Sequence, residues 1–414
     1  MKKPGIIVAF VLFALAGYCQ QPQTLGFKIL NDAKRVRIPF ELYNNLIVVP
    51  VVLNNQLPLK FVLDTGVRTT IITEKAFTDI LNLSYARKYT ISGIGDEAVQ
   101  GIEAYVTNGV SLTLPGVKGN GHAMLVLEED YLELRNHLGT DVHGILGYEL
   151  FSRFVVKVDY DNKMLTFTTP EHFRAGRRYE EIDISIEDTK PYVKGYLQYK
   201  GEEPIELKLM VDSGSSQGIM LDVNSNDKLH VPDDNLRCNL GRGLAGGLHG
   251  RVSRVEQFSI GDRAWQDPLV TFPEENDLID SLKSTDIFRN GSIGGEILGR
   301  FKVIFNFPEE KMYLRKGLHF KKSFDYNLSG VSVKAKGSRL NTFEITEVRP
   351  LSSAAAAGLQ AGDIILSVNN VPSTELNLER LTGMLNEKNN KLVRLEVKRS
   401  DLLIKTKFRL QNQI

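Results

Sequence analysis

The chain has 414 residues, of which 51 are Lys or Arg and 50 are Asp or Glu, so its formal net charge at pH 7 is +1. This length predicts two or three domains rather than a single core. Because the charges nearly cancel, the chain as a whole generates no field that would gather nucleic acid or an anionic membrane, and we expect neither as a partner.

The N-terminal end differs in character from the rest of the chain. A positive start at residues 2–3 precedes an apolar run over residues 6–16, which is too short to span a bilayer as a stable helix. This layout predicts a signal peptide over residues 1–19 and export to the periplasm or the outside of a bacterial cell. A lipid on Cys19 is the alternative, and a membrane is expected as a partner only in that case. Against it, Tyr18 occupies a position where bacterial lipoprotein signals carry a small residue.

The cysteine content leaves no room for a disulfide in the mature chain. Cys19 and Cys238 are the two cysteines of the sequence. If Cys19 leaves with the signal peptide, the fold must rest on its apolar core alone. A single remaining Cys is more often a small buried hydrophobic residue than a nucleophile.

Residues 20–175 are predicted to form a first lobe of β-structure. Apolar and β-branched runs predict strands at Leu46–Leu53 and Phe61–Leu63, and the second of them leads directly into Asp64-Thr65-Gly66. Acidic residues in the first turn favour a helix over Glu74–Leu81.

The end of this lobe carries a second recognisable segment, which reads GILGYELFSRFVVKVDYDNKMLTF from Gly144 to Phe167. It predicts a short helix at Leu146–Phe151 and a strand at Phe154–Val158.

The same order of segments recurs in residues 176–318. An apolar strand again ends in Asp212-Ser213-Gly214, and a later segment again contains Ile-Leu-Gly, Arg-Phe and an apolar strand, here Val303–Phe307. The interval between the two copies is the size of a domain and far longer than the period of a solenoid. We therefore expect two equivalent lobes in tandem.

The paired aspartates suit a known way of hydrolysing a peptide bond. The reaction needs one carboxylate to take a proton from water and one carboxylic acid to protonate the carbonyl oxygen. Two carboxyl groups about 3 Å apart cannot both ionise, so they share one proton and perform both tasks. Asp64 and Asp212 are the candidates for this catalytic pair. No metal or other cofactor is expected.

The residues that follow each aspartate fit the same arrangement. The hydroxyl of Thr65 or Ser213 can form a hydrogen bond across to the other lobe. Gly66 and Gly214 allow the backbone to approach the carboxylates without a Cβ in the way. One motif supplies half of such a site, so two are needed, and the chain has two.

Both lobes resemble the aspartic proteases of the retropepsin and pepsin class. The resemblance covers about three quarters of the chain. It rests on the two aspartate motifs and on an apolar-apolar-Gly segment in each lobe, Ile145-Leu146-Gly147 and Ile297-Leu298-Gly299, which in that family packs behind each catalytic loop. It implies a mainly β fold with two pepsin-like β-barrel lobes. It also implies that Asp64 and Asp212 act together in a cleft between the lobes that holds an extended peptide or unfolded protein.

The family pattern assigns further roles. Thr65 and Ser213 would lock the two catalytic loops together. Glycine-rich hairpins form flaps over the cleft in this family, and Gly93-Ile94-Gly95 is the expected flap of the first lobe. Gly241–Gly250 occupies the corresponding place in the second lobe, and neither segment has a clear counterpart of the flap tyrosine of pepsins.

One departure from the family pattern predicts an asymmetric pair. Members of the family usually carry Ser, Thr or Ala directly after the motif glycine, whereas this chain has Val67 in the first lobe and Ser215 in the second. Ser215 can donate a hydrogen bond to its own aspartate and Val67 cannot. We therefore expect Asp212 to ionise more readily than Asp64. Val67 packing beneath its loop is an equally good reading of that position.

Other catalytic motifs have weaker support. The segment from Gly214 to Gly218 matches the Gly-x-Ser-x-Gly elbow of serine hydrolases, but that elbow needs a strand-to-helix turn, and the residues from Ile219 onward predict a strand. The histidines show no pairing typical of zinc sites. No glycine-rich loop is followed by the Lys-[Ser/Thr] of a phosphate-binding loop.

Residues 324–412 predict a third, smaller domain of α+β type. The helix Leu376–Leu385 has leucines at helical spacing. Strands are expected at Val331–Val333, Phe343–Val348, Ile364–Val368 and Val393–Lys398.

This third unit resembles a bacterial PDZ domain. The resemblance is carried by Arg349–Asn370, and above all by the run Ala-Gly-Leu-x-x-Gly-Asp-x-Ile-Leu from Ala357 to Leu366. It implies that the domain binds a peptide as an added strand. By position, Leu340-Asn341-Thr342-Phe343 corresponds to the loop that holds the peptide carboxylate, and Leu376–Leu385 to the groove helix. The loop lacks the glycines of the family, so binding of an internal peptide segment stays open.

Two classes of function fit these features. The first is an exported aspartic endopeptidase whose PDZ domain recruits or gates peptide substrates. The second is an exported, non-catalytic peptide-binding protein whose protease lobes are degenerate. The two classes differ in whether Asp64 and Asp212 turn over a substrate.

Overall fold

The structure is a computed structural model that describes residues 25–91, 102–243, 246–274 and 287–414. The predicted signal peptide and the predicted flap residues Gly93, Ile94 and Gly95 lie outside the described residues. No described helix is long and apolar enough to cross a membrane.

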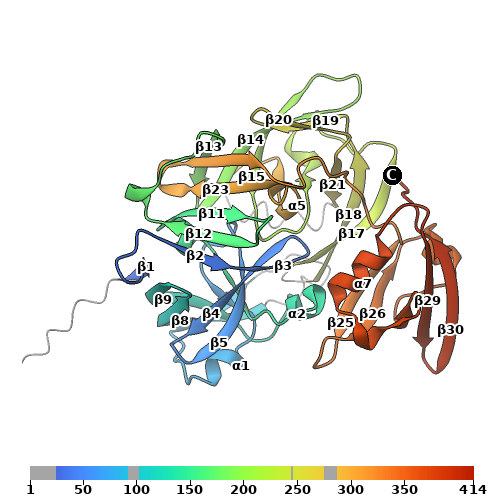
Figure 1. The fold of residues 1–414 in the computed structure, drawn as a ribbon, viewed down its shortest axis with the longest axis horizontal. Coiled ribbons are helices and arrows are strands. Elements are labelled where there is room, and N and C mark those ends of the chain that lie inside the picture. Colours follow the sequence, from blue (N-terminus) through green and yellow to red (C-terminus); the bar gives the residue numbers. More distant parts are fainter. Residues whose placement is uncertain (1–24, 92–101, 244–245, 275–286) are drawn as a thin grey trace, which may run out of the picture.

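The described part of the chain is mainly β, as predicted, and its strands form three sheets. Figure 1 shows the first two sheets side by side and the third, coloured orange to red, at the C-terminal end. The first sheet contains β1 (Gly26–Ile29), β3 (Glu41–Tyr43), β4 (Leu46–Leu53), β5 (Leu57–Leu63), β6 (Ile71–Ile72), β7 (Arg87–Ile91), β8 (Ile102–Leu114), β9 (Val117–Leu127) and β10 (Gly144–Leu146).

The second sheet is the largest of the three. It contains β2 (Arg35–Pro39), β11 (Val155–Asp159), β12 (Met164–Thr168), β13 (Glu180–Glu187), β14 (Lys190–Gln198), β15 (Ile205–Val211), β16 (Ile219–Leu221), β17 (Asn235–Gly243), β18 (Gly246–Arg254), β19 (Gln257–Ile260), β20 (Arg263–Gln266), β21 (Leu269–Pro273), β22 (Gly291–Ile293), β23 (Phe301–Asn306) and β24 (Lys311–Lys316). The third sheet contains β25 (Val331–Lys336), β26 (Thr342–Val348), β27 (Ile364–Val368), β28 (Val371–Pro372), β29 (Leu392–Arg399) and β30 (Leu402–Arg409).

The described helices are short. They are α1 (Ala76–Asp79), α2 (Leu134–Leu138), α3 (Tyr148–Phe151), α5 (Gly295–Leu298), α6 (Ser353–Ala356) and α7 (Leu378–Leu385). Asn377 caps α7, because its side chain accepts a hydrogen bond from the backbone N–H of Arg380. The buried leucines of α7, at 378, 381 and 385, lie on one face of the helix, as their spacing predicts.

The second sheet joins the two halves of the protease-like region. β11 pairs antiparallel with β23, from Val156 opposite Phe305 to Asp159 opposite Lys302. β2 and β12 extend the same sheet on the other side of β11. Three strands from the predicted first lobe therefore belong to the sheet of the second. The lobe boundary at residue 175 stays a prediction, and this sheet crosses it.

Burial separates the C-terminal domain from the rest. One continuous apolar core runs through both protease-like lobes and reaches Phe320 and Phe324 of the following linker. A second core belongs to residues 328–410 alone and includes Phe343, Leu381 and Val397. The C-terminal domain thus has the independent core expected of a separate folding unit.

The structure corrects several predicted bounds. The predicted helix at residues 74–81 is reduced to the single turn of α1. The predicted helix at residues 146–151 begins only at Tyr148, because Leu146 ends a strand that pairs with β5. Phe307 lies in a 3₁₀ turn after β23. The strand at Leu46–Leu53 is confirmed residue for residue.

Candidate active site

The backbone of the first aspartate loop is held by a parallel strand. β5 pairs in parallel with β10, with Leu63 opposite Leu146. The next backbone N–H, that of Asp64, donates to the carbonyl oxygen of Leu146 at 2.9 Å. The aspartate therefore leaves the sheet at a fixed point, directly after a fully buried strand end.

The second lobe repeats this arrangement. β15 pairs in parallel with β22, with Val211 opposite Ile293. The N–H of Asp212 donates to the carbonyl oxygen of Ile293, again at 2.9 Å. The internal repeat expected from the sequence is thus a repeat of backbone geometry around both aspartates.

The segment behind the second loop is not the predicted one. The counterpart of Ile145-Leu146-Gly147 is Ser292-Ile293-Gly294, whereas Ile297-Leu298-Gly299 forms α5 and its C-cap. Aligning the two copies on their Arg-Phe pairs, GILGYELFSRF with GSIGGEILGRF, places Gly147 opposite Gly294. The predicted match was displaced because Ile-Leu-Gly recurs by chance within the helical turn.

Gly147 and Gly294 explain why glycine is needed at this point. A Cβ on Gly147 would lie 2.2 Å from the carbonyl oxygen of Val67, and a Cβ on Gly294 would lie 2.4 Å from that of Gln217. Both neighbours are backbone atoms of the loop that follows the aspartate, so they have little freedom to move. Each glycine lets its strand end pack directly against that loop.

Thr65 and Ser213 connect the two loops through four hydrogen bonds. The Thr65 hydroxyl donates to the carbonyl oxygen of Val211 at 2.6 Å and accepts from the Ser213 N–H at 2.9 Å. The Ser213 hydroxyl donates to the carbonyl oxygen of Leu63 at 2.9 Å and accepts from the Thr65 N–H at 3.1 Å. Both side chains are buried, so water does not compete for these bonds. The network has the two-fold character that the family resemblance implies for these residues.

The two aspartate side chains meet between these loops. Asp64 and Asp212 share a hydrogen bond between their carboxyl groups. The N–H of Gly66 donates to Asp64 Oδ1 at 2.6 Å, and the N–H of Gly214 donates to Asp212 Oδ1 at 2.9 Å. Both aspartates keep some solvent-accessible surface, whereas their Thr and Ser neighbours do not. The pair is therefore enclosed by protein yet open to a small reactant such as water.

The electrostatics divide the pair into an acid and a base. Burial raises the pKa of both carboxyls. The neighbouring Asp212 charge raises the pKa of Asp64 further, well above its ordinary value. At Asp212 the Gly214 N–H and the Arg289 guanidinium oppose the effect of burial and hold the pKa down. Of the two carboxyls, Asp64 therefore keeps a proton more readily and Asp212 ionises more readily.

This asymmetry has the predicted direction but a different origin. The donor that Ser215 contributes toward Asp212 is its backbone N–H. The larger influence comes from Arg289, just before β22, which also donates to Met210 Sδ at 2.9 Å. Sequence reasoning missed this cation, because nothing in its local sequence sets it apart from other surface arginines.

Replacing Arg289 with Gln is expected to move the acidic limb of the pH profile of kcat/KM to higher pH. Without the guanidinium the Asp212 carboxylate loses a nearby positive charge that stabilises it. Its pKa therefore rises, and the base ionises only at a higher pH. A pH series with a fluorogenic peptide measures the limb. Ser215→Ala is the matched control, since alanine keeps the backbone N–H, and it is expected to leave the limb in place. Equal shifts in both variants would contradict this assignment.

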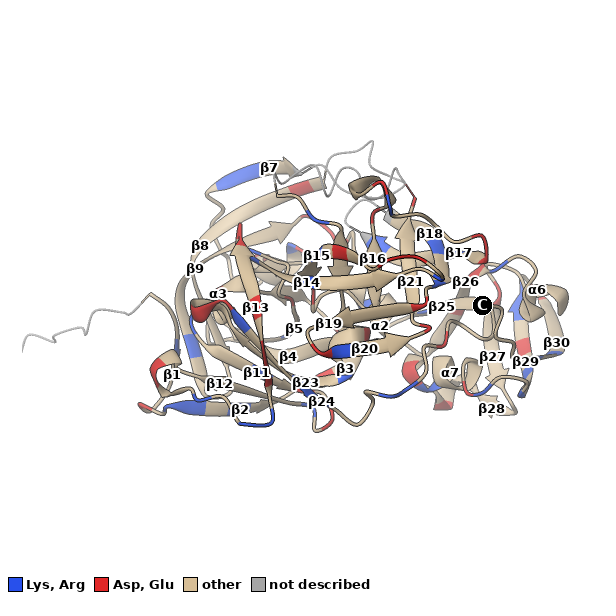
Figure 2. Ribbon diagram, turned by 90° about the horizontal axis from the view of Figure 1, so that it is seen from above, with Lys and Arg blue, Asp and Glu red and all other residues tan. Residues whose placement is uncertain are grey.

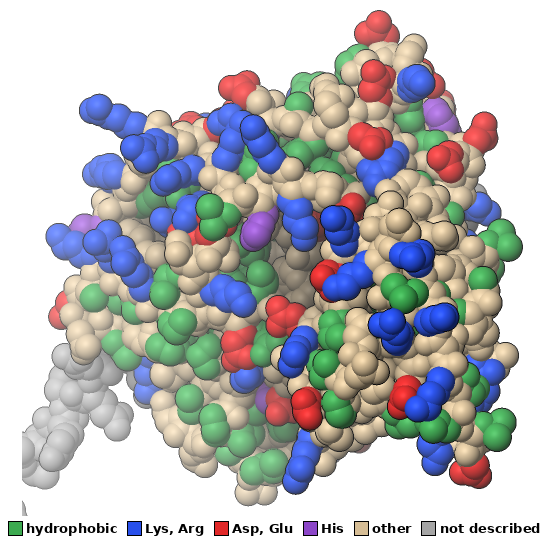
Figure 3. Space-filling model, turned by 45° about the vertical axis from the view of Figure 1, so that its right-hand side comes forward, with side chains coloured by type: hydrophobic (Ala, Val, Ile, Leu, Met, Phe, Trp, Pro, Cys, Tyr) green, Lys and Arg blue, Asp and Glu red, His purple; other side chains and the backbone are tan. Residues whose placement is uncertain are grey.

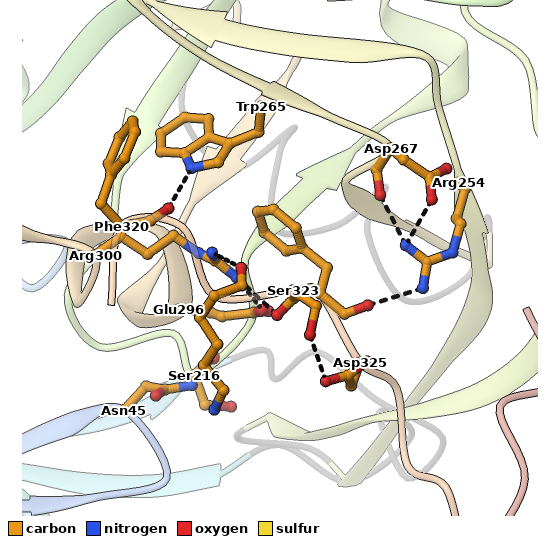
Figure 4. A network of polar contacts seen from close by, with 12 residues as sticks. Asn45, Ser216, Arg254, Trp265, Asp267, Glu296, Arg300, Phe320, Ser323 and Asp325 are labelled. Atoms are coloured by element: carbon orange, nitrogen blue, oxygen red, sulfur yellow. Dashed lines mark hydrogen bonds and ion pairs between the residues drawn. The ribbon is translucent and has the colours of Figure 1, made fainter. Parts of the chain in front are cut away.

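A polar network fixes the second loop from behind (Figure 4). The Asn45 side-chain amide donates to the carbonyl oxygen of Ser216 at 3.0 Å and so ties the first lobe to this loop. Glu296, on α5, pairs with the buried Arg300 at 3.3 Å. The Arg300 guanidinium donates to the carbonyl oxygens of Lys322 and Ser323 and lies 3.6 Å from the centre of the Phe324 ring. The linker to the C-terminal domain is therefore anchored on the element that supports the second aspartate loop.

The alternative sites receive no support from the described residues. The segment that matched the serine-hydrolase elbow leads into β16, a strand, as the sequence predicts, and not into a helix. No cluster of His, Cys, Asp and Glu that could hold a metal ion occurs in the described ranges. Cys238 is buried, and burial raises the pKa of its thiol to about 11, which is the behaviour of a packing residue.

The predicted carboxylate loop of the C-terminal domain lies at one end of a hairpin. Leu340 and Asn341 belong to the turn between β25 and β26, while Thr342 and Phe343 begin β26. Phe343 is fully buried in the core of the domain, so its side chain is not available to a ligand. The peptide-binding role of these four residues stays a prediction.

The strand that faces the helix α7 is β25. Within the described residues β25 pairs only with β26, so it is an edge strand, and α7 lies against it. An edge strand beside a helix is where an added peptide strand binds in this mode of recognition.

The comparisons with known proteins agree with this domain order. Residues 49–150 match the family model described as aspartyl protease, and residues 344–399 match the model described as PDZ domain. The predicted combination of an aspartyl-protease-like region with a C-terminal PDZ domain is thus confirmed.

None of the curated proteins matches the chain. Among solved structures, the photosystem II D1 C-terminal processing protease is 18% identical and has a TM-score of 0.19, over 20% of this chain and 22% of that chain. The match thus spans about a fifth of either protein, and a likeness of this size carries no argument about function.

Proposed function

We propose that this chain, with its aspartyl-protease-like and PDZ domains, is an exported aspartic endopeptidase that uses Asp64 and Asp212 to hydrolyse peptide or unfolded protein substrates. The observation that carries the proposal is the shared hydrogen bond between the two carboxyls, held by reciprocal bonds between Thr65 and Ser213. A degenerate lobe would have no need for a hydrogen-bonded pair of partly buried carboxyls, which is costly to keep in a fold.

The placement of the proton on Asp64 rather than Asp212 suggests the order of the proton transfers. The Asp212 carboxylate takes a proton from a water molecule, whose oxygen forms a bond to the peptide carbonyl carbon. Asp64 gives its proton to the carbonyl oxygen. When the tetrahedral intermediate collapses, the C–N bond breaks, the amine leaves with the proton held by Asp212, and Asp64 recovers its proton from the intermediate's hydroxyl. The pair returns to its starting protonation after each turnover.

Turnover is tested with the mature chain and an unfolded protein substrate between acidic and neutral pH. We expect cleavage that a pepstatin-type inhibitor blocks, because such inhibitors place a hydroxyl between two carboxyls. The absence of cleavage at every pH, with substrate still bound, would instead favour a peptide-holding protein. The export step is tested separately by sequencing the N-terminus of the secreted protein, where a start at Gln20 is expected.

The PDZ domain is positioned to gate this activity. Helix α2 of the first lobe contacts β25 (Figure 1). The Arg135 guanidinium donates to the carbonyl oxygens of Ser338 at 2.9 Å and of Gly337 at 3.3 Å. Lys334 of β25 pairs with Glu133 at 2.8 Å. No residue of β25 is fully exposed, which is unusual for an edge strand. A peptide that adds to β25 must therefore displace α2.

The segment before α2 reaches the catalytic region. The carbonyl oxygen of Tyr131 accepts a hydrogen bond from Arg242 of β17 at 2.9 Å. Tyr131 packs against the small apolar cluster of Ile102, Ala104 and Leu127, and so does Ile71, on the strand that follows the first aspartate loop. Release of α2 from the PDZ domain would thus act on both sides of the cleft, which is how peptide binding could gate cleavage.

Arg135→Ala is expected to speed hydrogen exchange of the β25 backbone amides by roughly tenfold, since two hydrogen bonds to a charged group are lost. Exchange followed by mass spectrometry on the full chain measures this. Arg409→Ala is the control, because Arg409 makes a similar bond, to the carbonyl oxygen of Asn390 at 2.9 Å, on the opposite edge of the PDZ sheet. If Arg135→Ala leaves exchange in β25 at the rate of the unchanged protein, the gating proposal fails while the protease proposal stands.

A further inference from the structure

A cavity of about 250 Å³ lies on the second sheet, away from the catalytic pair. Its wall combines cationic and hydroxyl side chains with an apolar part that includes Val155, Phe173 and Ile304. The cations and threonines of the wall are Arg35, Arg37, Lys157, Thr166, Thr168 and Arg174. We call this site the cationic cavity. Figure 2 shows β2, β11 and β12 side by side with Lys and Arg positions on β2, and Figure 3 shows Lys and Arg side chains gathering at the left of the molecule.

Strand register brings these side chains to one face of the sheet. Arg37 of β2 lies opposite Thr166 of β12, which in turn lies opposite Lys157 of β11. Arg35 and Thr168 form the next pair on the same face, because side chains two positions apart point the same way.

The cavity faces away from the main core. Val156 and Val158, on either side of Lys157, belong to the apolar core shared by the lobes. Their side chains point to one face of β11, so that of Lys157 points to the other. On that other face lies a separate small cluster that includes Val155, Ile304 and Tyr313. The cationic cavity is therefore distinct from the catalytic cleft.

Among the described residues, the cations of this cavity lack carboxylate partners, and the Lys157 ammonium lies over the Tyr179 ring, 6.0 Å from its centre. In the described ranges, Arg35, Arg37 and Lys157 make no ion pair, and no Asp or Glu lines the cavity. On the adjacent strand β23, by contrast, Lys302 lies 2.8 Å from Asp159 and 3.4 Å from Asp161.

Two further polar side chains at the rim, those of Arg174 and His172, do not change this balance. Within the part of the chain that the structure describes, Arg174 donates to two backbone carbonyl oxygens, those of Phe173 at 2.5 Å and Glu171 at 3.4 Å. His172 lines the cavity and lies 3.2 Å from the carboxylate of Glu171, which is not a lining residue. Burial lowers the pKa of Lys157, and Lys302, Arg315 and Arg37 lower it further against the pull of Asp159. An anion in the cavity would relieve this repulsion.

From this arrangement we infer that the cationic cavity binds a phosphate group. Two guanidinium groups offer paired N–H donors in the fork geometry that phosphate oxygens accept, Lys157 adds a point charge, and the two threonine hydroxyls add neutral donors. The volume lies just below the range of about 300 Å³ and more that is typical of small-molecule pockets, which suits a headgroup-sized anion. The phosphate comes either from a small soluble phosphate ester or from an anionic lipid headgroup.

The experiment uses the mature full chain and the double variant Arg37→Gln/Lys157→Gln. One arm measures binding of inorganic phosphate by calorimetry. The other measures sedimentation with vesicles of phosphatidylglycerol, with phosphatidylcholine vesicles as the uncharged reference. Lys407→Gln, an exposed cation on the PDZ strand β30, is the matched control. Thermal melting shows that each variant is folded, and the exposed positions of Arg35 and Arg37 make Arg35→Gln/Arg37→Gln a second variant should the first not fold.

We expect the double variant to bind at least tenfold more weakly than the unchanged protein and the Lys407→Gln control in one of the two arms. Loss confined to the phosphate arm identifies a soluble phosphate ester as the source, and loss confined to the phosphatidylglycerol arm identifies a lipid. Equal binding by all variants in both arms, or no binding in either, would overturn the inference. Neither arm depends on proteolysis, so this outcome is independent of the proposed enzyme function.

Discussion

Asp64→Asn and Asp212→Asn are each expected to reduce kcat by on the order of 10³-fold or more. Each substitution removes one of the two proton-transfer groups, and a single positioned acid or base contributes about 10²–10⁴-fold. The pair shares one proton, so neither carboxyl can take over the role of the other. Single-turnover cleavage of a fluorogenic peptide measures the loss.

Stability distinguishes lost chemistry from lost structure in these variants. The pKa of Asp64 is raised in the folded state, so the folded chain binds more protons than the unfolded chain between the ordinary and the raised value. Stability therefore falls as pH rises through that window. Asparagine carries no charge and removes this loss, so Asp64→Asn is expected to melt at or above the temperature of the unchanged protein at neutral pH. An inactive variant with a lower melting temperature would not count in favour of the dyad.

Gly214→Ala is expected to lower kcat by about 10²-fold or more. A Cβ at this position would lie 2.1 Å from Asp64 Oδ2 and 2.2 Å from its Cγ, so the opposite carboxyl must move. A displacement of about 1 Å in a catalytic group costs on the order of 10²-fold. The same fluorogenic assay measures the effect.

Gly66→Ala is the matched control, because the two glycines occupy equivalent places in the repeat. A Cβ on Gly66 would lie 3.2 Å from Asp64 Oδ1 and 3.5 Å from Asp212 Oδ1, distances that a small adjustment can absorb. We expect Gly66→Ala to retain most of the activity. Equal losses in the two variants would mean that the carboxyls are not disposed as described.

The sequence was most informative where a local pattern carries the geometry. Asp64 and Asp212 are far apart in the chain, yet each follows an apolar strand and precedes a glycine, and this repeated context predicted that they act together. The hydroxyls of Thr65 and Ser213 were predicted on the same ground, and the structure joins them by hydrogen bonds. A motif that occurs twice can predict that two residues far apart in the chain lie together, which a single motif cannot.

Other parts of the site depend on packing between distant segments, which local patterns do not record. Arg289 acts on Asp212 only because β22 runs beside β15. The contact of α2 with β25 joins residues about two hundred positions apart. Neither segment carries a local sequence pattern that predicts this contact. The displaced Ile-Leu-Gly match in the second lobe shows a different failure, in which a short apolar tripeptide recurred by chance and an alignment on Arg-Phe would have placed Gly294 correctly.

A balanced overall charge does not describe how charge is distributed over local surfaces. From the formal net charge of +1 we expect neither nucleic acid nor an anionic membrane as a partner of the whole chain, and that expectation stays a prediction. At the cationic cavity, β2, β11 and β12 bring together cations from separate segments, and no carboxylate of the described residues lines it. A sum over the chain cannot register such a separation of charge.

The pH profile of kcat/KM tests the central claim of a single shared proton most directly. If Asp212 is the ionised base and Asp64 the protonated acid, the profile is bell-shaped: activity rises as Asp212 ionises and falls as Asp64 loses its proton, with the falling limb well above the ordinary aspartate pKa of 3.8. A profile that rises with pH to a plateau and shows no falling limb would contradict the account, because it would describe a lone base rather than a pair that shares a proton.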